Sequence, residues 1–530
     1  MEFPLSNQPV LIVGAGPTGL MMACALARYG VSFRIIDKKP ERTSASNATW
    51  IQTRTLELLD QIGIADNFIK AGHPCDAINL YADGEHLSRL SLKQIDSIYP
   101  FILMLPQSKT EKLLEDYLNA LNYRIERSVE LIDIRHDNDT VISTLKYADG
   151  HTEIVSSNWL IACDGANSIV REKCGFHFPG EDLTEQFMVA DAHIDFSHIP
   201  KDEVHFFFDS GTVLAAFPLG ENRYRLAANL HLDYPRKIFT EREVIEIVQE
   251  RAHGKYYVTD VTWISPFWIH GKVAEHMQKG PIFLVGDAGH IHSPAGGQGM
   301  NTGIQDAYNL AWKLALVIKG KAKPSLLESY QSERYPIVKE VVNQNEHFTK
   351  LALFDKDFLS KLQKLSQELS NGSSHVDLEK KFGSQLTQLD IQYKNSPIIN
   401  YENKSTLLAP GLHATEVRVN QTTLYHYFRN TQHNILLFTG LNPAKETLEK
   451  INLLQKSLSN QYSELIKSYI VYKDQLSSDH TIVDTNWIIH ETYGINKPAV
   501  FIIRPDTYCA YYSEDLNIEP IEKFLRTYLY

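Results

Sequence analysis

The stretch Val10-Leu11-Ile12-Val13-Gly14-Ala15-Gly16-Pro17-Thr18-Gly19 begins with an apolar run and continues into three spaced glycines. An apolar run of this length is typical of a buried parallel strand. A helical apolar pattern follows from Leu20 to Ala27 and ends near Gly30. A second apolar run, Val31 to Ile36, leads to Asp37. This order predicts a strand, a glycine turn, a helix and a second strand, which together form the unit of a dinucleotide-binding α/β fold.

The three glycines have separate physical roles in such a unit. Gly14 permits the tight turn, Gly16 lets the backbone approach a pyrophosphate, and Gly19 allows the helix to pack on the strand. The pyrophosphate lies at the positive end of the helix, and Asp37 is placed to accept hydrogen bonds from a ribose. Glycine turns also occur without a ligand, but the strand context and the terminal acid favour a nucleotide. The expected cofactor contacts in this unit are Gly14, Gly16, Pro17, Thr18, Gly19, Asp37 and Lys38.

Two later apolar runs also end next to an acid. Trp159 to Cys163 is followed by Asp164-Gly165, and Ile282 to Val285 is followed by Gly286-Asp287. An acid at the C-terminal end of a strand points into the crevice where open α/β sheets bind ligands. A lone pair of this kind is more often a turn that caps a helix. Three such elements in this order indicate one large bound nucleotide, and FAD is the best candidate.

A glycine-rich run, Gly296-Gly297-Gln298-Gly299, follows the last of these acids. Its glycines leave room for a flat ring to lie against the backbone. A helical pattern then extends from Ile304 to Ile318, and its N-terminus can aim free N–H groups at an anionic reduced flavin. The alternative is a loop that only connects a strand to a helix.

The motifs resemble those of the single-component flavoprotein aromatic hydroxylases, the class A flavin monooxygenases, which include phenol and polyketide hydroxylases. The resemblance covers most of the chain. It rests on the first glycine unit, Arg54 to Leu59, Leu105 to Ser108, Cys163 to Arg171 and Gly286 to Asp306.

The resemblance implies a role for individual residues. Gln107 would meet the ribityl–phosphate portion of FAD, Asp287 would bind the ribityl chain, and Pro294 would lie near the isoalloxazine ring. Backbone groups of Gly299, Met300 and Asn301 would face the pyrimidine edge of that ring. Cys163 to Arg171 is similar to a dual FAD/NAD(P)H motif, so Asp164 would contact FAD, and Asp164 and Arg171 would contact a transient NADPH or NADH. A structural ion pair between Asp164 and Arg171 is the alternative. Asn47 and Pro281 stand where relatives commonly carry arginine, and these departures concern the substrate and flavin movement more than FAD binding.

The expected architecture is a discontinuous α/β FAD-binding domain of the Rossmann-like, glutathione-reductase type, formed by residues 1–175 and 281–345. Alternating aromatic runs in residues 176–280 predict an inserted antiparallel β-sheet domain that binds the substrate. Residues 346–400 predict a helical connector. Residues 401–530 resemble a thioredoxin-like domain without a C-x-x-C motif, and Lys497-Pro498 is where that fold usually places a cis-proline.

The composition of the chain excludes several classes of partner and site. A net charge of -12 argues against nucleic acid or an anionic membrane as a partner. Five widely spaced cysteines indicate neither a disulfide framework nor a zinc site, and the histidines show no metal spacing. No signal peptide or membrane-spanning run is expected, so the sequence predicts a cytoplasmic protein. The C-terminal domain is given a structural or subunit-contact role, and a homodimer is one expected assembly.

The resemblance implies a monooxygenase that uses FAD, NAD(P)H and O₂ to hydroxylate a phenolic or polycyclic aromatic compound through a flavin C4a-hydroperoxide. No second G-x-G-x-x-G unit is present, so NAD(P)H would visit the flavin without its own domain. The catalytic residues are not identified by the sequence. Two alternatives are a flavin-dependent reductase or dehydrogenase on the same scaffold, and a catalytically idle flavoprotein with an interaction role.

Overall fold

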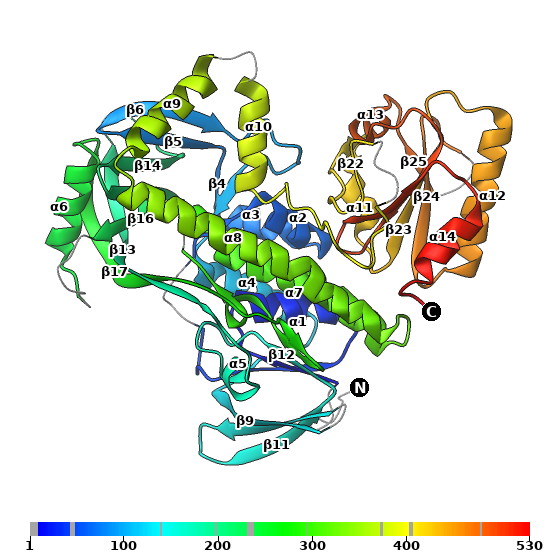
Figure 1. The fold of residues 1–530 in the computed structure, drawn as a ribbon, viewed down its shortest axis with the longest axis horizontal. Helices are drawn as coiled ribbons and strands as arrows, with labels where there is room; N and C mark the ends of the chain where they lie inside the picture. The colour runs from blue at the N-terminus through cyan, green and yellow to red at the C-terminus, as the bar shows by residue number, and fades with distance from the viewer. Residues whose placement is uncertain are drawn as a thin grey trace.

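A computed structural model describes residues 9–42, 48–137, 140–196, 199–230, 238–293, 295–371, 375–401, 406–476 and 480–530. Asn47 and Pro294, both singled out in the sequence, lie outside these residues. Figure 1 shows a central α/β unit with a large β-sheet on one side and a second α/β unit on the other. The long helix α8 crosses the middle of the molecule in the same view.

The central unit is built on a six-stranded sheet of order β18-β19-β12-β1-β2-β8. Its strands are β1 Val10–Val13, β2 Phe33–Asp37, β8 Glu126–Arg127, β12 Trp159–Ala162, β18 Gln278–Lys279 and β19 Ile282–Leu284. β1 pairs in parallel with β2 and β12, and β12 pairs in parallel with β19. Parallel strands end at one edge of the sheet, so the residues that follow β1, β2, β12 and β19 are brought together there. The three strands that the sequence predicted around the acids are confirmed.

Two layers cover the sheet. On one face, Val10, Ile12 and Ile161 pack in the same apolar cluster as α1 Pro17–Arg28, α4 Gln107–Ala120 and α7 Gly299–Ile318. On the other face, the neighbouring residues of these strands pack against a three-stranded sheet of β9 Val129–Asp137, β10 Thr140–Tyr147 and β11 Thr152–Ser157. The alternation of side chains along a strand explains why every residue of β1 is buried.

Between β2 and α4 the chain forms a small outer part of this unit. It contains the helices α2 Thr53–Gln61 and α3 Ala65–Ala71, and a sheet of β3 Trp50–Ile51, β7 Ile102–Met104 and β4 His73–Cys75. A short helix, α5 Ile169–Lys173, follows the loop after β12.

The second sheet has eight strands in the order β20-β17-β13-β16-β15-β14-β5-β6. The strands are β5 Ala77–Ala82, β6 Glu85–Ser91, β13 Gly180–Phe196, β14 Val204–Asp209, β15 Thr212–Gly220, β16 Arg223–Leu230, β17 Tyr256–Val273 and β20 His290–Ile291. The antiparallel strands expected within residues 176–280 are present, and helix α6 Glu241–Arg251 packs on their outer face. The sheet is larger than expected, because β14 pairs in parallel with β5 and so recruits residues 77–91.

Helices connect the central unit to the C-terminal unit. They are the 3₁₀ turn η4 Pro324–Leu327, α8 Glu328–Phe354, α9 Phe358–Asn371 and α10 His375–Leu386. The residues expected as a helical connector are largely helical. The boundary placed at residue 345 falls inside α8, which continues as one helix into the connector.

The C-terminal unit has a five-stranded sheet of order β25-β24-β23-β26-β27, with β23, β24 and β25 parallel and β26 and β27 antiparallel. Its elements are β21 Arg418–Val419, β22 Thr422–Thr423, α11 Leu424–Phe428, β23 His433–Phe438, α12 Lys445–Gln461, β24 Ile466–Tyr472, β25 Thr481–Val483, α13 Ile488–Tyr493, β26 Ala499–Ile503, β27 Cys509–Ser513 and α14 Ile518–Leu525. The described residues contain no cis peptide bond, so Lys497–Pro498 is trans. The resemblance is wrong on this detail, and trans is the lower-energy form of an isolated X–Pro bond.

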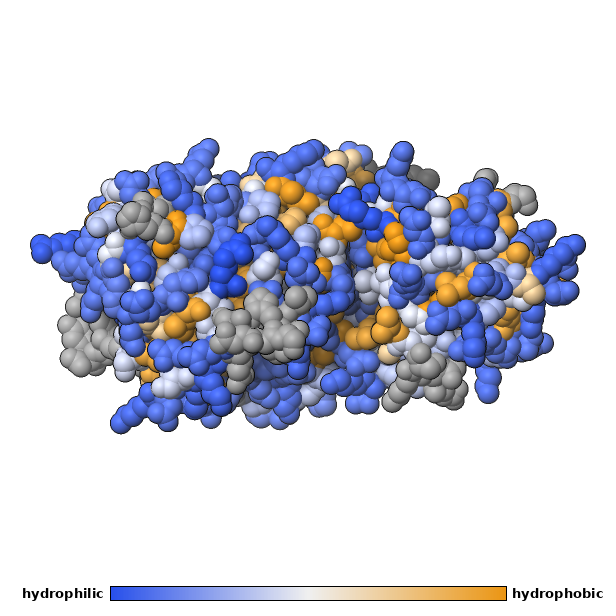
Figure 2. All heavy atoms as spheres, turned by 90° about the horizontal axis from the view of Figure 1, so that it is seen from above, coloured by the Kyte–Doolittle hydropathy of each residue, from blue (hydrophilic) through white to orange (hydrophobic). Residues whose placement is uncertain are grey.

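The surface carries no large apolar band on the face seen in Figure 2, where hydrophilic residues predominate and apolar residues lie in small separate groups. None of the described helices is both long enough and apolar enough to cross a bilayer.

Glu416 supports a prediction about pH and stability. Its carboxylate is buried, and Oε1 accepts hydrogen bonds from the backbone N–H groups of Val417 at 2.9 Å and Tyr425 at 3.0 Å. Oε2 has no partner among the described residues. Burial, with Glu57 adding to it, raises the pKa of Glu416 to about 8. The folded state therefore holds a proton that the unfolded state releases above its ordinary pKa near 4.5.

This proton stabilises the fold at acidic pH, and its contribution is lost as the pH rises from about 4.5 to about 8. Glu416→Gln keeps the uncharged shape and removes the titration. We expect the variant to gain stability over wild type between pH 5 and pH 8, by at most about 1.4 kcal/mol per pH unit. Urea denaturation of both proteins across this range measures the difference. A constant difference at all pH values would contradict the prediction.

Candidate functional site

The glycine turn after β1 is shaped by contacts that only glycine allows. Gly14 has a φ of +101°, and a Cβ there would lie 2.2 Å from the carbonyl oxygen of Cys163. A Cβ on Gly19 would lie 1.9 Å from the carbonyl oxygen of Gly14. Gly16 differs, because a Cβ there would meet no atom within 4 Å. Gly14 and Gly19 are therefore required by the fold itself, whereas the space beside Gly16 is open.

Helix α1 begins at this turn without a side-chain cap and without an acidic residue in its first turn. Asp37 at the end of β2 is tied to the turn, because its carboxylate accepts hydrogen bonds from the N–H groups of Ala15 and Lys39, both at 2.8 Å. Lys38 beside it is exposed. The start of α1 thus presents the positive end of its dipole next to a fixed carboxylate.

Thr18 of α1 is the point at which the N-terminal turn meets the Asp287 turn, the 3₁₀ segment Gly286–Ala288. A Cβ on Gly286 would lie 2.7 Å from Thr18 Oγ1, and a Cβ on Gly303 of α7 would lie 2.5 Å from the same atom. Two glycines that are 17 residues apart in the numbering thus pack on one hydroxyl of the first helix. The structure brings the Gly14 turn, the Asp287 turn and α7 together, as expected from the order of the motifs.

The Asp287 side chain is exposed, although Gly286 and Ala288 on either side are buried. Desolvation by the surrounding protein raises the pKa of Asp287, while His290 opposes the rise and Asp306 adds to it. The carboxylate is therefore accessible to solvent yet closely surrounded by protein atoms. This is a suitable setting for an acceptor of ligand hydroxyl groups.

The loop after β12 carries a second acid close to the turn. Asp164 Oδ2 accepts a hydrogen bond from the N–H of Val170 at 3.3 Å, and Oδ1 has no partner among the described residues. Burial raises the pKa of Asp164. Arg171 donates to the carbonyl oxygens of Ala166 at 2.7 Å and Ala288 at 3.0 Å. Arg171 therefore ties the Asp164 loop to the Asp287 turn. Asp164 attracts the Arg171 charge, but the described residues contain no direct ion pair between the two side chains.

The start of α7 is held by Asn301, whose side chain makes four hydrogen bonds. Oδ1 accepts from the N–H of Gln52 at 2.9 Å and from Thr55 Oγ1 at 2.7 Å, while Nδ2 donates to the carbonyl oxygens of Trp50 at 2.8 Å and Gly297 at 2.7 Å. The helix has no side-chain cap and no acidic residue in its first turn. The backbone of Gly299, Met300 and Asn301 is thus fixed in place at the positive end of a 20-residue helix.

Gln107 begins α4 and lies against the segment before β3. Its N–H donates to the carbonyl oxygen of Ala48 at 2.8 Å, and its Nε2 donates to Glu111 Oε1 at 2.9 Å. Its contact with FAD stays a prediction.

Asp306 ends the Gly286–Asp306 motif, but the sequence assigned no role to it. Its Oδ2 accepts from His290 Nε2 at 2.7 Å and from the N–H of Gly286 at 3.3 Å, so it binds both sides of the Asp287 turn. Its Oδ1 accepts from Arg334 Nε at 2.6 Å. An acid that lies within a mostly apolar helix, directly before Ala307, is the sequence feature that could have indicated a buried functional role for Asp306.

The inner face of the eight-stranded sheet looks toward this site. Arg225 pairs with Asp191 at 2.8 Å and donates to Thr49 Oγ1 at 2.6 Å, and the ring of Phe217 lies 5.7 Å from that of Trp50. Trp50 in turn packs on Gly297, where a Cβ would lie 2.7 Å from its ring. The same face carries half-buried apolar side chains at Phe187, Val189, Phe206, Phe217, Ala227 and Phe267.

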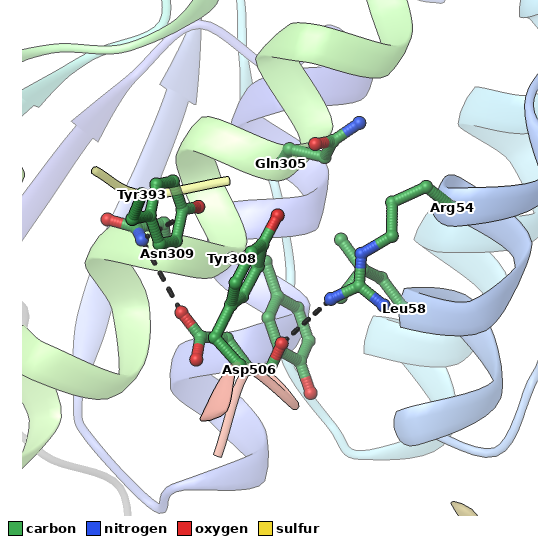
Figure 3. A pocket seen from close by; sticks show the side chains of 8 residues that line it. Arg54, Leu58, Gln305, Tyr308, Asn309, Tyr393 and Asp506 are labelled. Atoms are coloured by element: carbon green, nitrogen blue, oxygen red, sulfur yellow. Dashed lines mark hydrogen bonds between the residues drawn. The ribbon is translucent and has the colours of Figure 1, made fainter. Parts of the chain in front are cut away.

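A small cavity lies elsewhere, between α2, α7 and the C-terminal unit (Figure 3). Its volume of about 10 Å³ is enough for about one water molecule. It is lined by Arg54, Leu58, Gln305, Tyr308, Asn309, Tyr393, Asp506 and Tyr508. It is too small for an organic ligand, so it is not the functional site.

The residues of the site fit FAD. The backbone is open at Gly16, Asp164 has an unpartnered buried oxygen, Asp287 presents an accessible carboxylate, and α1 and α7 both begin without a side-chain cap. The open backbone at Gly16 leaves room for a dinucleotide, and the oxygens of Asp164 and Asp287 can accept hydrogen bonds from its hydroxyl groups. The free N–H groups at the starts of α1 and α7 can donate to its anionic parts. The described residues contain no group of three His, Cys, Asp or Glu side chains that could hold a metal ion.

Comparison with known proteins agrees with this assignment. Residues 7–345 match the model of a family described as "FAD binding domain". The chain is 30% identical over 526 residues to a 6-methylpretetramide 4-monooxygenase of Streptomyces rimosus, covering 94% of this chain and 90% of that protein. It is 32% identical over 425 residues to an uncharacterized aromatic compound monooxygenase of Bacillus subtilis, covering 79% and 83%. An anhydrotetracycline hydroxylase from Streptomyces rimosus superposes with a TM-score of 0.77 at 27% identity, covering 99% of both chains.

Proposed function

The chain belongs to the FAD binding domain family of flavin-dependent aromatic monooxygenases, and we propose on that premise that it uses NAD(P)H and O₂ to hydroxylate a phenolic or polycyclic aromatic compound. The observation that carries this proposal is the convergence of the Gly14 turn, the Asp287 turn and α7 on Thr18. Segments some 270 residues apart meet there, as an extended dinucleotide requires.

The residues of the site would divide the work of holding FAD. The open backbone at Gly16 and the start of α1 would bind the pyrophosphate, and Asp37 the adenosine ribose. Asp287 would accept hydrogen bonds from the ribityl chain, and Gly299 to Asn301 would present backbone N–H groups. Bound FAD supplies the redox chemistry and the activation of O₂, while the protein supplies orientation, exclusion of water and electrostatics. Because the cofactor does this chemistry, no nucleophile or paired-carboxylate site is required.

The inner face of the eight-stranded sheet is the proposed binding surface for the substrate. Its half-buried side chains are mainly aromatic or small, and they lie opposite the glycine loop that begins α7. Flat rings pack well on such a face. Two relatives are named for polycyclic substrates, 6-methylpretetramide and anhydrotetracycline, and these names support a polycyclic substrate for this chain.

NADPH or NADH is the proposed electron donor, and it would visit the flavin without a domain of its own. Asp164 and Arg171 remain the proposed contacts. Asp164 has an unpartnered oxygen, and Arg171 donates to both the Asp164 loop and the Asp287 turn. The C-terminal unit is proposed to be thioredoxin-like, on the basis of its strand order and its alternation of strands and helices. It has no C-x-x-C motif, so it would not exchange disulfides.

A turnover screen tests the proposal. Protein reconstituted with FAD is mixed with NADPH or NADH and a panel of phenols and polycyclic polyketides, and NAD(P)H oxidation is followed together with the product mass. We expect at least one compound to accelerate oxidation and to gain one oxygen atom. Oxidation without oxygen incorporation would favour a reductase, and FAD binding without any oxidation would favour an idle flavoprotein.

Phe217 provides a specific prediction about the substrate surface. Phe217→Ala removes a ring that packs on Trp50, next to the glycine loop. An aromatic contact contributes about 0.5–1.5 kcal/mol beyond its buried area, so we expect KM for the aromatic substrate to rise about tenfold with a smaller change in kcat. Phe348→Ala, on the exposed surface of α8, is the control and should leave KM unchanged. An unchanged KM in Phe217→Ala would place the substrate elsewhere.

A further inference from the structure

A buried polar network connects the Asp287 turn to the C-terminal unit. Its first part lies at the site, where Asp306 holds Gly286 and His290 on either side of Asp287 and is itself held by Arg334 of α8. Asp306 and Arg334 are both fully buried. The position of the turn therefore depends on the position of Arg334.

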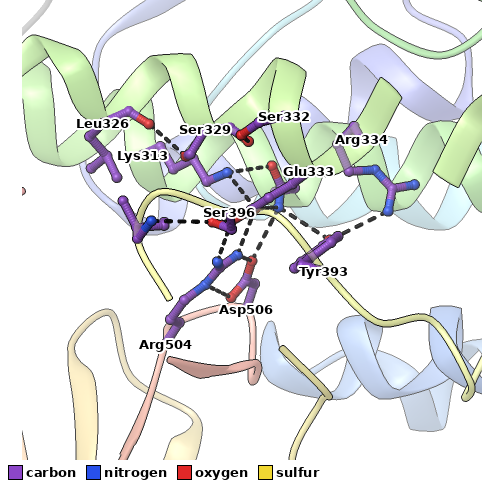
Figure 4. Close-up of polar contacts among 12 residues, drawn as sticks. Lys313, Leu326, Ser329, Ser332, Glu333, Arg334, Tyr393, Ser396, Arg504 and Asp506 are labelled. Atoms are coloured by element: carbon purple, nitrogen blue, oxygen red, sulfur yellow. Dashed lines mark hydrogen bonds and ion pairs between the residues drawn. The ribbon is translucent and has the colours of Figure 1, made fainter. Parts of the chain in front are cut away.

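The network continues from Arg334 along the facing sides of α7 and α8 (Figure 4). The hydroxyl of Tyr393 accepts from Arg334 Nη1 at 3.4 Å and from Asn309 Nδ2 at 3.2 Å. Asn309 Nδ2 also donates to Glu333 Oε2 at 2.7 Å, and Asn309 Oδ1 accepts from Lys313 Nζ at 2.8 Å. Asp306 and Asn309 lie one turn apart on α7, and Glu333 and Arg334 are neighbours on α8.

Arg504, which follows β26 in the C-terminal unit, completes the network. It donates to both oxygens of Glu333, at 2.5 and 3.0 Å, and to both oxygens of Asp506, at 2.9 and 2.5 Å. Its guanidinium also lies over the rings of Trp312 and Tyr393, at 5.2 and 5.3 Å from their centroids. Arg504 is thus the cation shared by α8 and the C-terminal unit, and it has no exposed surface.

The charges of the network are balanced and depend on one another. It contains the cations Lys313, Arg334 and Arg504 and the carboxylates Asp306, Glu333 and Asp506. Burial opposes the ionisation of Glu333, but Arg504 and Lys313 outweigh this effect and hold the pKa of Glu333 well below its usual value. Loss of one charge in such a buried cluster leaves a partner uncompensated, and the neighbours must rearrange.

We infer that Arg504 is a positioning residue for the flavin site, and that the C-terminal unit thereby controls the affinity of the central unit for FAD. Without Arg504, the carboxylates of Glu333 and Asp506 would both depend on Lys313 for charge compensation. The side chains between α7 and α8 would then rearrange around Lys313, and the two helices would shift relative to each other. Arg334 and Asp306 lie on the facing sides of these helices, so the Asp287 turn would lose its support. This inference rests on the proposed FAD site at that turn.

The first test is the FAD dissociation constant, measured by quenching of FAD fluorescence in the full-length folded protein. We expect Arg504→Met to weaken FAD binding by roughly tenfold, within the range usual for coupled sites. The double variant Glu333→Gln/Arg504→Met again has equal numbers of cations and carboxylates, and we expect its affinity to return to within about threefold of wild type. The control Lys497→Met breaks an exposed ion pair with Glu514 in the same unit and should bind FAD as wild type does.

Two results would overturn the inference: wild-type affinity in folded Arg504→Met, or a double variant that binds FAD no better than Arg504→Met. A wild-type protein that failed to bind FAD would instead overturn the proposed function, so the two failures are distinguishable.

A second measurement uses wild-type protein alone and does not depend on the folding of a variant. Coupling is reciprocal, so FAD binding must also stabilise the segment that carries Arg504. We expect FAD to slow amide hydrogen exchange of residues 499–508 severalfold, and to leave α12, on the same unit, unaffected. Exchange in 499–508 that does not respond to saturating FAD would show that the C-terminal unit and the flavin site are independent.

Discussion

Gly16→Val is expected to abolish FAD binding while leaving the apoprotein folded. A side chain at this position meets no protein atom within 4 Å, and the φ of -76° is one that any residue adopts. The protein therefore has no steric reason to unfold. The pyrophosphate of FAD, however, is expected to approach the backbone at Gly16, where the added carbons would keep it away from the start of α1.

We expect the dissociation constant for FAD to rise at least about a hundredfold, since a displaced pyrophosphate loses several charge-assisted hydrogen bonds. Fluorescence titration with FAD measures the affinity, and thermal unfolding of the apoprotein measures the fold. Gly271→Ala is a matched control, because its Cβ would make only ordinary contacts and lies in β17. Gly14→Ala, in contrast, should prevent folding, because its Cβ would overlap the backbone of Cys163. A Gly16→Val protein that binds FAD like wild type would place the pyrophosphate elsewhere.

The contrast between Gly14 and Gly16 also shows what a sequence can predict. The strand, turn and helix around these glycines are determined by local patterns, and Val10–Val13 was predicted with its observed bounds. The acids after β12 and β19 were found in the same way, because a short apolar run ending at Asp-Gly or Gly-Asp is visible in a few residues. The convergence of the three turns then follows from a rule about parallel strands, which requires no knowledge of side-chain packing.

The parts that were missed depend on contacts between distant segments. Residues 77–91 join the second sheet because β5 pairs with β14, more than a hundred residues later, and no local pattern specifies that partner. Arg225 and Asp191 read as ordinary strand residues, and only their pairing across β13 and β16 reveals a buried ion pair near Thr49. The motif that ends at Asp306 predicts no role for this acid, because its partners His290 and Arg334 lie 16 and 28 residues away.

Arg54→Met is expected to cause a large loss of stability in a protein that still folds, because Arg54 is the second buried cation between the central and C-terminal units. It donates to Glu57 Oε2 at 2.8 Å, to the carbonyl oxygen of Asp506 at 2.8 Å and to Thr507 Oγ1 at 2.9 Å. Glu57 is fully buried, so methionine would leave its carboxylate with no charged partner except His413, which lies 4.0 Å away and whose pKa is lowered by burial. Breaking a buried pair in this way costs about 3–5 kcal/mol, and we expect a loss of that size in the free energy of unfolding measured with urea.

We attribute this loss to the uncompensated charge of Glu57 rather than to the lost contacts of Arg54, and a second variant separates the two causes. Arg54→Met/Glu57→Gln removes both charges, so we expect it to recover more than half of the stability lost by Arg54→Met. Arg242→Met breaks a fully exposed pair with Glu246 on α6 and should have no measurable effect. If Arg54→Met were as stable as wild type, or if the double variant were the less stable of the two, the joint between the units would depend on its apolar contacts. These contacts are extensive, since Ile435 and Leu437 of β23 share one apolar cluster with α1 and α7. The ion pairs set the alignment of that apolar joint, and Arg54 is expected to matter because it fixes the same loop that carries Asp506.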